Sequence, residues 1–336
     1  MASLPQCKLP VIDFSVKNLN PGSDSWTKTR GEVTRALEQY GCFIASYDQV
    51  SQELHDAAFV ASQAVHNLPV EAKVRNTLDA QGYGFVAQPA NMPLYVRLSI
   101  ENATTAQGVE GFAKLMWPNG NDTFCESVLA FTKALAELEQ MVMRMVAKSY
   151  GIEKHYERLL GSTTCILKFN KCVNPNQENE KKLGVIPHRD KSFMTVIQQQ
   201  EEGKGLEVQT KDGEWTQVHL SPSSCIVMAG DACMVNIYNI CARAHTENKS
   251  VREAWSNGRI EAPYHRVIMQ QNKDRYSLVL SSFIKDLKIE VPQELVDKDH
   301  PLQFKAFDHY DYIQYVSDTT VEGNRMKGAI SSYCGI

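Results

Sequence analysis

Apolar residues in the first half of the chain recur mainly with the spacing of α-helices. The pattern predicts helices over residues 26–40, 52–68 and 123–150, with short buried strands over 9–14 and 41–45. The longest predicted helix carries an apolar stripe, which we interpret as core packing. Its members are Phe131, Leu135, Leu138, Val142 and Met145. Residues 70–122 show no period and are rich in Gly, Asn and Pro, so we expect an irregular stretch there.

The pattern changes after residue 162, where short apolar runs are separated by turn residues. These runs predict strands over residues 165–170, 193–198, 205–209, 225–229, 264–270 and 276–283. Residues 211–214, with the sequence Lys-Asp-Gly-Glu, predict a hairpin turn. Many short strands at such spacing are typical of a sandwich, a barrel or a jelly roll. Residues 295–336 return to a mixed polar helical pattern whose aromatic side chains can pack on the body.

Composition and charge exclude several kinds of partner. The 336 residues are 43% hydrophobic and 22% charged, which fits a soluble globular protein. The net charge is −4 and no basic block is present, so we expect no nucleic-acid partner. No apolar run approaches the roughly 20 residues that span a bilayer, and the N-terminus does not read as a signal peptide. We therefore expect no membrane partner and, because no coiled-coil pattern is present, a monomer.

Cysteine usage indicates a reducing compartment. The nine cysteines are odd in number and scattered, and no C-x-x-C pair occurs. This distribution favours free, mostly buried thiols over a disulfide framework, so we expect a cytoplasmic protein.

One short run carries a candidate metal site. In residues 184–190, His188 and Asp190 are two positions apart on a predicted strand and would share one face. Imidazole with carboxylate suits Fe(II), Mn(II) or Zn(II). Two other His-x-acid triplets, His309 with Asp311 and His245 with Glu247, show that the spacing alone is weak.

The downstream context singles out His188 and Asp190. His265 lies on a later strand-like run and offers a third ligand. Arg275 and Ser277 follow on the next run, where they again share a strand face. Arginine binds carboxylates bidentately and a hydroxyl adds one donor. Two His and one carboxylate leave half of an octahedral site open, so the Arg/Ser pair could hold an acidic cosubstrate there.

These residues, together with several shorter motifs, resemble those of plant-type Fe(II)- and 2-oxoglutarate-dependent dioxygenases. The resemblance covers nearly the whole chain. Besides the five residues above, its motifs are residues 9–13, 40–43, 205–208, 212–215, 256–259 and 265–267. Residues 115–118 and 294–302 are most similar to the branch that contains deoxypodophyllotoxin synthase and the glucosinolate alkenyl-forming dioxygenases.

The resemblance implies both a fold and a set of cofactors. It implies a double-stranded β-helix, a cupin-like jelly roll, at residues 161–290. A helical and loop-rich region (1–160) and a C-terminal helical segment (291–336) would flank that core. By matching positions, His188, Asp190 and His265 would bind Fe(II), and Arg275 with Ser277 would bind 2-oxoglutarate. O2 would be the second cosubstrate and ascorbate the reductant.

Two features depart from the family pattern. On the strand that carries Asn170, the usual tyrosine is replaced by Cys172, and losing one hydroxyl donor should weaken 2-oxoglutarate binding by about 0.5–1.5 kcal/mol. Residues 235–253, 19 in number, interrupt a stretch that is nearly continuous in relatives. They are interpreted as a surface loop, a functional lid or a gene-modelling artefact, and deleting them should preserve soluble yield and iron binding.

The expected activity is oxidation of a C–H bond of a plant specialised metabolite, by hydroxylation, ring closure, desaturation or demethylation. Phe85 and Phe283 are the candidate substrate contacts. One alternative is a catalytically impaired jelly-roll relative, which Cys172 and the 235–253 stretch favour. Another is a hormone oxidase acting on a gibberellin or auxin. Its carboxylate would need an additional Arg or Lys in the pocket, and the sequence alone does not place one.

Overall fold

The computed structural model describes most of the chain in detail. The described residues are 9–16, 19–77, 84–174, 182–200, 205–233, 256–257, 259–269, 273–298, 301–302, 305–321 and 329–334. The 235–253 stretch, with His245 and Glu247, therefore lies outside the described residues.

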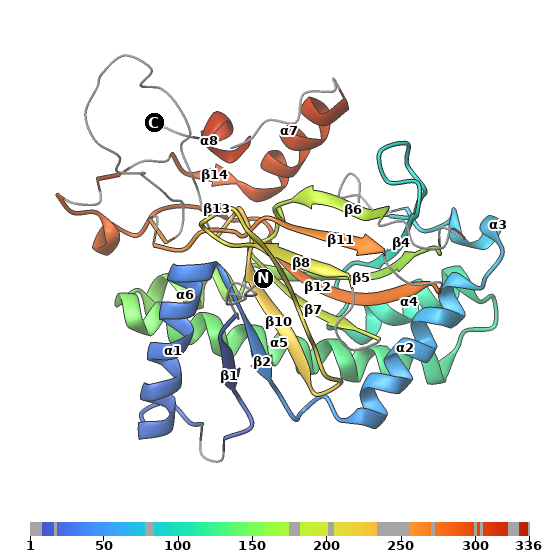
Figure 1. Cartoon of the computed structure of the whole chain (residues 1–336), viewed down its shortest axis with the longest axis horizontal. Coiled ribbons are helices and arrows are strands. Elements are labelled where there is room, and N and C mark those ends of the chain that lie inside the picture. The colour runs from blue at the N-terminus through green and yellow to red at the C-terminus, as the bar shows by residue number, and fades with distance from the viewer. Residues whose placement is uncertain are drawn as a thin grey trace, which may run out of the picture.

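Two facing β-sheets form the centre of the molecule (Figure 1). The larger sheet has eight strands, in the spatial order β1 (Val11–Asp13), β2 (Cys42–Ser46), β10 (Ser224–Ala229), β7 (Met194–Gln199), β12 (Arg275–Ile284), β5 (Thr163–Cys172), β4 (Tyr95–Ile100) and β3 (Val86–Ala87). The smaller sheet has the order β6 (Lys182–His188), β11 (His265–Met269), β8 (Leu206–Gln209) and β9 (Trp215–Gln217). All of these pairs are antiparallel except β1 with β2. The jelly-roll prediction is confirmed.

Apolar side chains between the two sheets form one cluster, to which Val208 and Val267 of the smaller sheet and Met228 and Val279 of the larger contribute. The opposite face of the larger sheet packs on helices, and Leu278 and Leu280 of β12 belong to that second core. Alternation along β12 thus separates a helix-facing side from a cavity-facing side.

The helices cover the outer face of the larger sheet, with the long helix α5 running beneath it in Figure 1. They are α1 (Asp24–Tyr40), α2 (Gln52–His66), α4 (Ala106–Met116) and α5 (Asp122–Tyr150). Helix α6 (Glu153–Leu160) packs on α5, and the short α3 (Val70–Lys73), which buries no residue, lies against α4. The Ser23 side chain caps the first turn of α1, accepting a hydrogen bond from the backbone N–H of Trp26 at 3.0 Å. Gly151 ends α5 at φ 70°, a left-handed conformation that glycine adopts readily. The three predicted helices are confirmed to within two residues.

The expectation of an irregular stretch over residues 70–122 is wrong. That stretch contains β4, which pairs with β5 over six residues, and α4, which the Thr105 side chain caps. Pro93 just before β4, and Gly108 and Gly111 within α4, weakened the local signal of both elements. The long β5 edge supplies β4 with a pairing partner, and such tertiary pairing outweighs local preference.

The C-terminal part lies above the two sheets in Figure 1, and its helix α7 (His309–Val321) contacts β12. It contains β13 (Lys288–Ile289), the 3-10 turn η1 (Gln293–Leu295), β14 (Phe307–Asp308), α7 (His309–Val321) and α8 (Ala329–Cys334). Phe307 and Tyr312 are buried there, as the aromatic pattern predicts. All seven cysteines in the described part of the chain are free thiols. No helix in that part combines the length and apolarity needed to cross a bilayer.

Candidate metal and cosubstrate site

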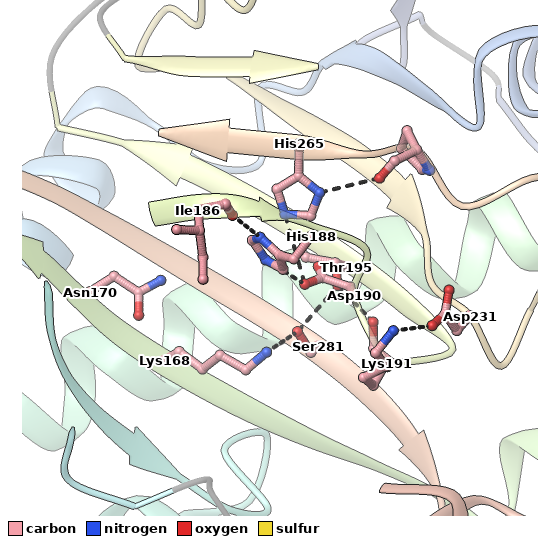
Figure 2. A network of polar contacts seen from close by, with 12 residues as sticks. Lys168, Asn170, Ile186, His188, Asp190, Lys191, Thr195, Asp231, His265 and Ser281 are labelled. Carbon is pink, nitrogen blue, oxygen red and sulfur yellow. Dashed lines mark hydrogen bonds and ion pairs between the residues drawn. The ribbon is translucent and has the colours of Figure 1, made fainter. Parts of the chain in front are cut away.

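His188, Asp190 and His265 converge in a cavity between the two sheets (Figure 2). One ligand atom from each residue lies within 4.8 Å of the others. Asp190 Oδ1 is 3.5 Å from His188 Nε2 and 3.8 Å from His265 Nε2. Among the described residues, this is the one group of three or more His, Cys, Asp or Glu side chains close enough to hold a metal ion.

Strand pairing places the two histidines, and a turn places the carboxylate. His265 is the register partner of His188 across the β6–β11 ladder. Strand β6 ends at His188, so the prediction that Asp190 lies on the same strand is wrong. Asp190 lies in the turn towards β7, where its backbone carbonyl accepts a hydrogen bond from Asp231 N at 2.7 Å. The turn still directs the Asp190 carboxylate at both rings.

Hydrogen bonds fix the orientation of both rings. His188 Nδ1 lies 2.9 Å from the Ile186 carbonyl, and His265 Nδ1 lies 3.4 Å from the Pro263 carbonyl. A carbonyl oxygen only accepts hydrogen bonds, so Nδ1 of each neutral ring carries the proton and the free lone pair resides on Nε2. Both Nε2 atoms face Asp190, which is the arrangement that a bound metal requires.

Burial sets the charges of the site. Burial, with a smaller contribution from the neighbouring His188, lowers the pKa of His265 to about 4, against the opposing charge of Asp190. Burial alone would raise the pKa of Asp190, but His265, His188 and Lys168 hold it well below its ordinary value. The site therefore offers an ionised carboxylate and a neutral imidazole near neutral pH.

A buried, unsatisfied oxygen indicates that this donor set fits a cation. Asp190 Oδ2 is buried and has no hydrogen-bond partner among the described residues. Buried carboxylate oxygens are costly when left unmatched. A divalent metal would satisfy it, and two imidazoles with one carboxylate suit non-haem Fe(II).

Arg275 and Ser277 line the same cavity, on the cavity-facing side of β12. Arg275 Nη1 donates to Ser277 Oγ at 3.3 Å, and Nη2 donates to the Gln199 side-chain oxygen. Gly205 lies close to this pair: a Cβ there would lie 2.8 Å from the Ile268 carbonyl oxygen and 3.3 Å from Arg275 Cδ. All five residues predicted for iron and cosubstrate are thus brought together.

Cys172 lies beside this pair, opposite Arg275 in the β5–β12 register. Burial raises the pKa of its thiol to about 11. The side chain stays a neutral thiol, which is a weak hydrogen-bond donor.

The cavity has a volume of about 290 Å³ and contains polar residues that the sequence analysis did not select. Tyr95, Arg97, Lys168 and Asn170 are among them. Lys168 and Asn170 share a strand face with Cys172, so strand alternation from Cys172 could have found them. Arg97 was not selected because it lies in residues 70–122, the stretch that was expected to be irregular.

Neither candidate substrate contact is among the described residues that line the cavity. Phe283 is fully buried behind it, packed with Ile166 and Ile313. Phe85 packs on the helical core, 5.9 Å from the Lys73 ammonium. The triplet His309-x-Asp311 is not part of the site either, since both His309 ring nitrogens are hydrogen-bonded to backbone groups.

Comparisons with known proteins agree with this geometry. Residues 163–283 match the 2OG-Fe(II) oxygenase superfamily, and residues 9–105 match the N-terminal region of non-haem dioxygenases in morphine synthesis. A "Probable 2-oxoglutarate-dependent dioxygenase AOP1" of Arabidopsis thaliana is 39% identical over 313 residues, covering 92% of this chain and 96% of the relative.

One further relative and one solved structure are also similar to this chain. A "Probable inactive 2-oxoglutarate-dependent dioxygenase AOP2" of Arabidopsis thaliana is 30% identical over 415 residues, covering 98% of each chain. The solved 2-oxoglutarate complex of the Arabidopsis thaliana dioxygenase for auxin oxidation 1 superposes with a TM-score of 0.72 at 26% identity. That match covers 88% of this chain and 100% of the other.

Proposed function

Because the chain belongs to the 2OG-Fe(II) oxygenase superfamily, we propose that His188, Asp190 and His265 hold its Fe(II). In the same proposal, the Arg275 guanidinium and the Ser277 hydroxyl bind the distal carboxylate of 2-oxoglutarate. The observation that carries the proposal is the convergence of these five side chains in one cavity, from two facing sheets.

The bound iron would supply activation of O2, coupled to decarboxylation of 2-oxoglutarate to succinate and CO2. The chain's own residues would bind and orient the cosubstrate, and they would exclude water from the site. Arg275 offers a planar, charged fork that matches a carboxylate, and the Gln199 side chain holds that fork from behind. Leu206, Val267 and Val279 give the cavity apolar walls, which limit competing reactions with water.

The replacement of the family tyrosine by Cys172 weakens this cosubstrate site in the proposal without removing it. Arg275 contributes the charge-assisted hydrogen bond, which is stronger than a neutral one. Ser277 keeps one hydroxyl close to the guanidinium. We therefore propose a functional 2-oxoglutarate site.

The proposed reaction is oxidation of a C–H bond in a small specialised metabolite, with ascorbate keeping the iron reduced. We propose that the chain acts as a cytoplasmic monomer. The test is succinate release from 2-oxoglutarate under air, with and without Fe(II), in wild type and in Arg275→Ala. Succinate formation that needs Fe(II) and Arg275 is expected. A folded wild-type protein that forms none would contradict the proposal.

Two alternatives have specific support. The relative described as probably inactive, together with Cys172, favours a catalytically impaired protein. The presence of Arg97 and Lys168 in the cavity favours an acidic substrate, as a hormone oxidase would require. Succinate release decides the first alternative, and comparing turnover of an acid with turnover of its neutral amide decides the second.

A further inference from the structure

The turn that carries Asp190 is held from outside by hydrogen bonds to its backbone. We call residues 190–192 the ligand turn. Its three consecutive carbonyls each accept a hydrogen bond from another segment of the chain. Asp231 N donates to the first carbonyl at 2.7 Å, and Ala232 N donates to the third at 3.2 Å. The second carbonyl, that of Lys191, has a side chain as its donor, so this bond can be removed by substitution.

His309, the first residue of α7, is that donor. Its Nδ1 accepts a hydrogen bond from Ile284 N at 3.1 Å, and its Nε2 lies 2.7 Å from the Lys191 carbonyl oxygen. Burial lowers the pKa of His309 to about 4, so the ring is neutral near pH 7. A ring nitrogen that accepts from an N–H carries no proton, so the proton of this ring resides on Nε2 and is donated to the ligand turn.

The His309 ring connects the ligand turn to a strand of the larger sheet. Ile284 is the last residue of β12, and the ring also lies against Phe283 of that strand, with ring centres 5.2 Å apart. The His309 side chain is fully buried. Because both nitrogens are bonded to backbone groups, the ring fixes the position of the turn relative to β12.

Tyr312 holds the same turn by a second route. Its hydroxyl donates to Asp231 Oδ2 at 2.8 Å, and Lys191 Nζ is ion-paired with the same oxygen. Figure 2 shows this ion pair next to Asp190. The Asp231 backbone N–H is the group that donates to the Asp190 carbonyl. Tyr312 therefore fixes the residue that binds the first carbonyl of the ligand turn.

One face of α7 serves both the ligand turn and the cavity. His309, Tyr312, Ile313 and Val316 recur at three- and four-residue spacing, so they lie along one side of the helix. Ile313 and Val316 line the cavity, above which α7 lies in Figure 1. The helix that closes the cavity therefore also contacts the turn that carries a metal ligand.

The three candidate ligands differ in how the fold holds them. His188 and His265 are paired across the β6–β11 ladder, whereas Asp190 lies beyond the end of β6. The direction of its carboxylate therefore depends on the contacts of the ligand turn. Groups that orient a metal ligand typically change metal affinity by about 10- to 100-fold.

We propose that His309 and Tyr312 are positioning residues of the metal site, and that through them α7 holds Asp190 in the direction that Fe(II) binding requires. Neither side chain belongs to the described lining of the cavity, so each acts through the ligand turn. The inference rests on the proposed function.

Two replacements of His309 separate positioning from general support of the fold. His309→Gln places an amide nitrogen near the position of Nε2, which keeps a donor for the Lys191 carbonyl and removes the acceptor of Ile284 N. His309→Asn places an amide oxygen near the position of Nδ1, which keeps that acceptor and removes the donor. Each variant loses one of two hydrogen bonds, so the two should unfold at similar temperatures.

The measurement is the Mn(II) affinity of the full-length protein by electron paramagnetic resonance, with the unfolding temperature of the metal-free protein alongside. His309→Asn should bind Mn(II) about tenfold more weakly than wild type, the lower end of the effect of losing a group that orients a ligand. His309→Gln should bind within about twofold of wild type, because the Lys191 carbonyl keeps a donor. In the anaerobic Fe(II) and 2-oxoglutarate complex, the visible charge-transfer band should shift in His309→Asn only.

Tyr312→Phe tests the second route, because it removes the hydroxyl and keeps the ring. Mn(II) affinity should fall by about threefold, since Lys191 still holds Asp231. Tyr310→Phe is the control on the same helix. The Tyr310 hydroxyl is buried and has no hydrogen-bond partner among the described residues, so its removal should leave the affinity unchanged.

Equal Mn(II) affinities of His309→Asn and His309→Gln would overturn the inference. A loss of affinity that follows the unfolding temperature in every variant would do so too. Should neither His309 variant fold, equal affinities of Tyr312→Phe and Tyr310→Phe would overturn it instead. A folded wild type whose Mn(II) binding is unaffected by Asp190→Ala would contradict the proposed function itself, before the α7 variants are compared.

Discussion

His188 and His265 lie 77 positions apart in the chain, yet they are direct partners across the β6–β11 ladder with ring centres 4.1 Å apart. The candidate metal site depends on this register. A slip of one residue would turn His265 to the other face of its strand, away from His188 and Asp190. Residues of β5 and β12, in the larger sheet, form the opposite wall of the cavity.

Replacing Asp190 by Ala should abolish tight iron binding. The carboxylate supplies the one negative charge of the triad. Losing a residue that only hydrogen-bonds to a metal ligand lowers metal affinity by up to about 100-fold, so losing Asp190 itself should lower Fe(II) affinity by more than that. Mn(II) binding followed by electron paramagnetic resonance gives the measurement. Asp311→Ala, in the His309-x-Asp311 triplet, is the matched control and should bind as wild type does. Equal loss in both variants would contradict the assignment.

Ser277→Ala and Cys172→Ala should differ in their effect on the cosubstrate. Removing the Ser277 hydroxyl should weaken 2-oxoglutarate binding by about 1 kcal/mol, or about fivefold. Removing the Cys172 thiol should change it by less than about twofold, because a thiol is a weak donor. Titration of the Fe(II)-loaded protein compares the two. A larger loss in Cys172→Ala would show that the thiol takes part in binding.

Glu139 should make folding stability depend on pH. Burial in α5 raises the pKa of its carboxyl from 4.5 to about 7, against the lowering effect of the Ser282 hydroxyl. The folded state therefore binds the proton more tightly than the unfolded state. The stabilisation from this proton is complete below pH 4.5 and is lost as the pH rises through 7.

Glu139→Gln removes that dependence. The difference in the free energy of unfolding, variant minus wild type, should rise by an amount on the order of 2 kcal/mol from pH 5 to pH 8. Urea unfolding of the metal-free protein at both pH values measures the difference. Glu137→Gln, an exposed position on the same helix, is the control. Parallel pH profiles for wild type and Glu139→Gln would contradict the prediction.

The sequence predicts the architecture, and it predicts His188, Asp190, Arg275 and Ser277 because each pair has a local signal, a spacing of two positions. The helical spacing of 123–150, the short strands after residue 162 and the pairing of Arg275 with Ser277 at two positions all follow from side-chain periodicity. The His265 position becomes meaningful only through its family context. That His188 and His265 face each other is set by long-range strand pairing, which periodicity does not encode.

Arg97 shows why the rest of the site could not be predicted. It lies on a six-residue strand whose existence depends on β5, a segment about seventy positions later in the chain. No local pattern places its side chain in the cavity. Phe283 shows a different error. It lies on the same side of β12 as Ser277, but further along the strand, where Ile166 and Ile313 cover its ring.

Anaerobic titration of the purified protein with Fe(II) and 2-oxoglutarate tests the central claim most directly, by following the visible metal-to-ligand charge-transfer band. The claim is that one cavity holds iron through His188, Asp190 and His265, and 2-oxoglutarate through Arg275. The account predicts a band in wild type that disappears in Arg275→Ala. A folded wild-type protein that shows no band, or a band that is unchanged in Arg275→Ala, would contradict it.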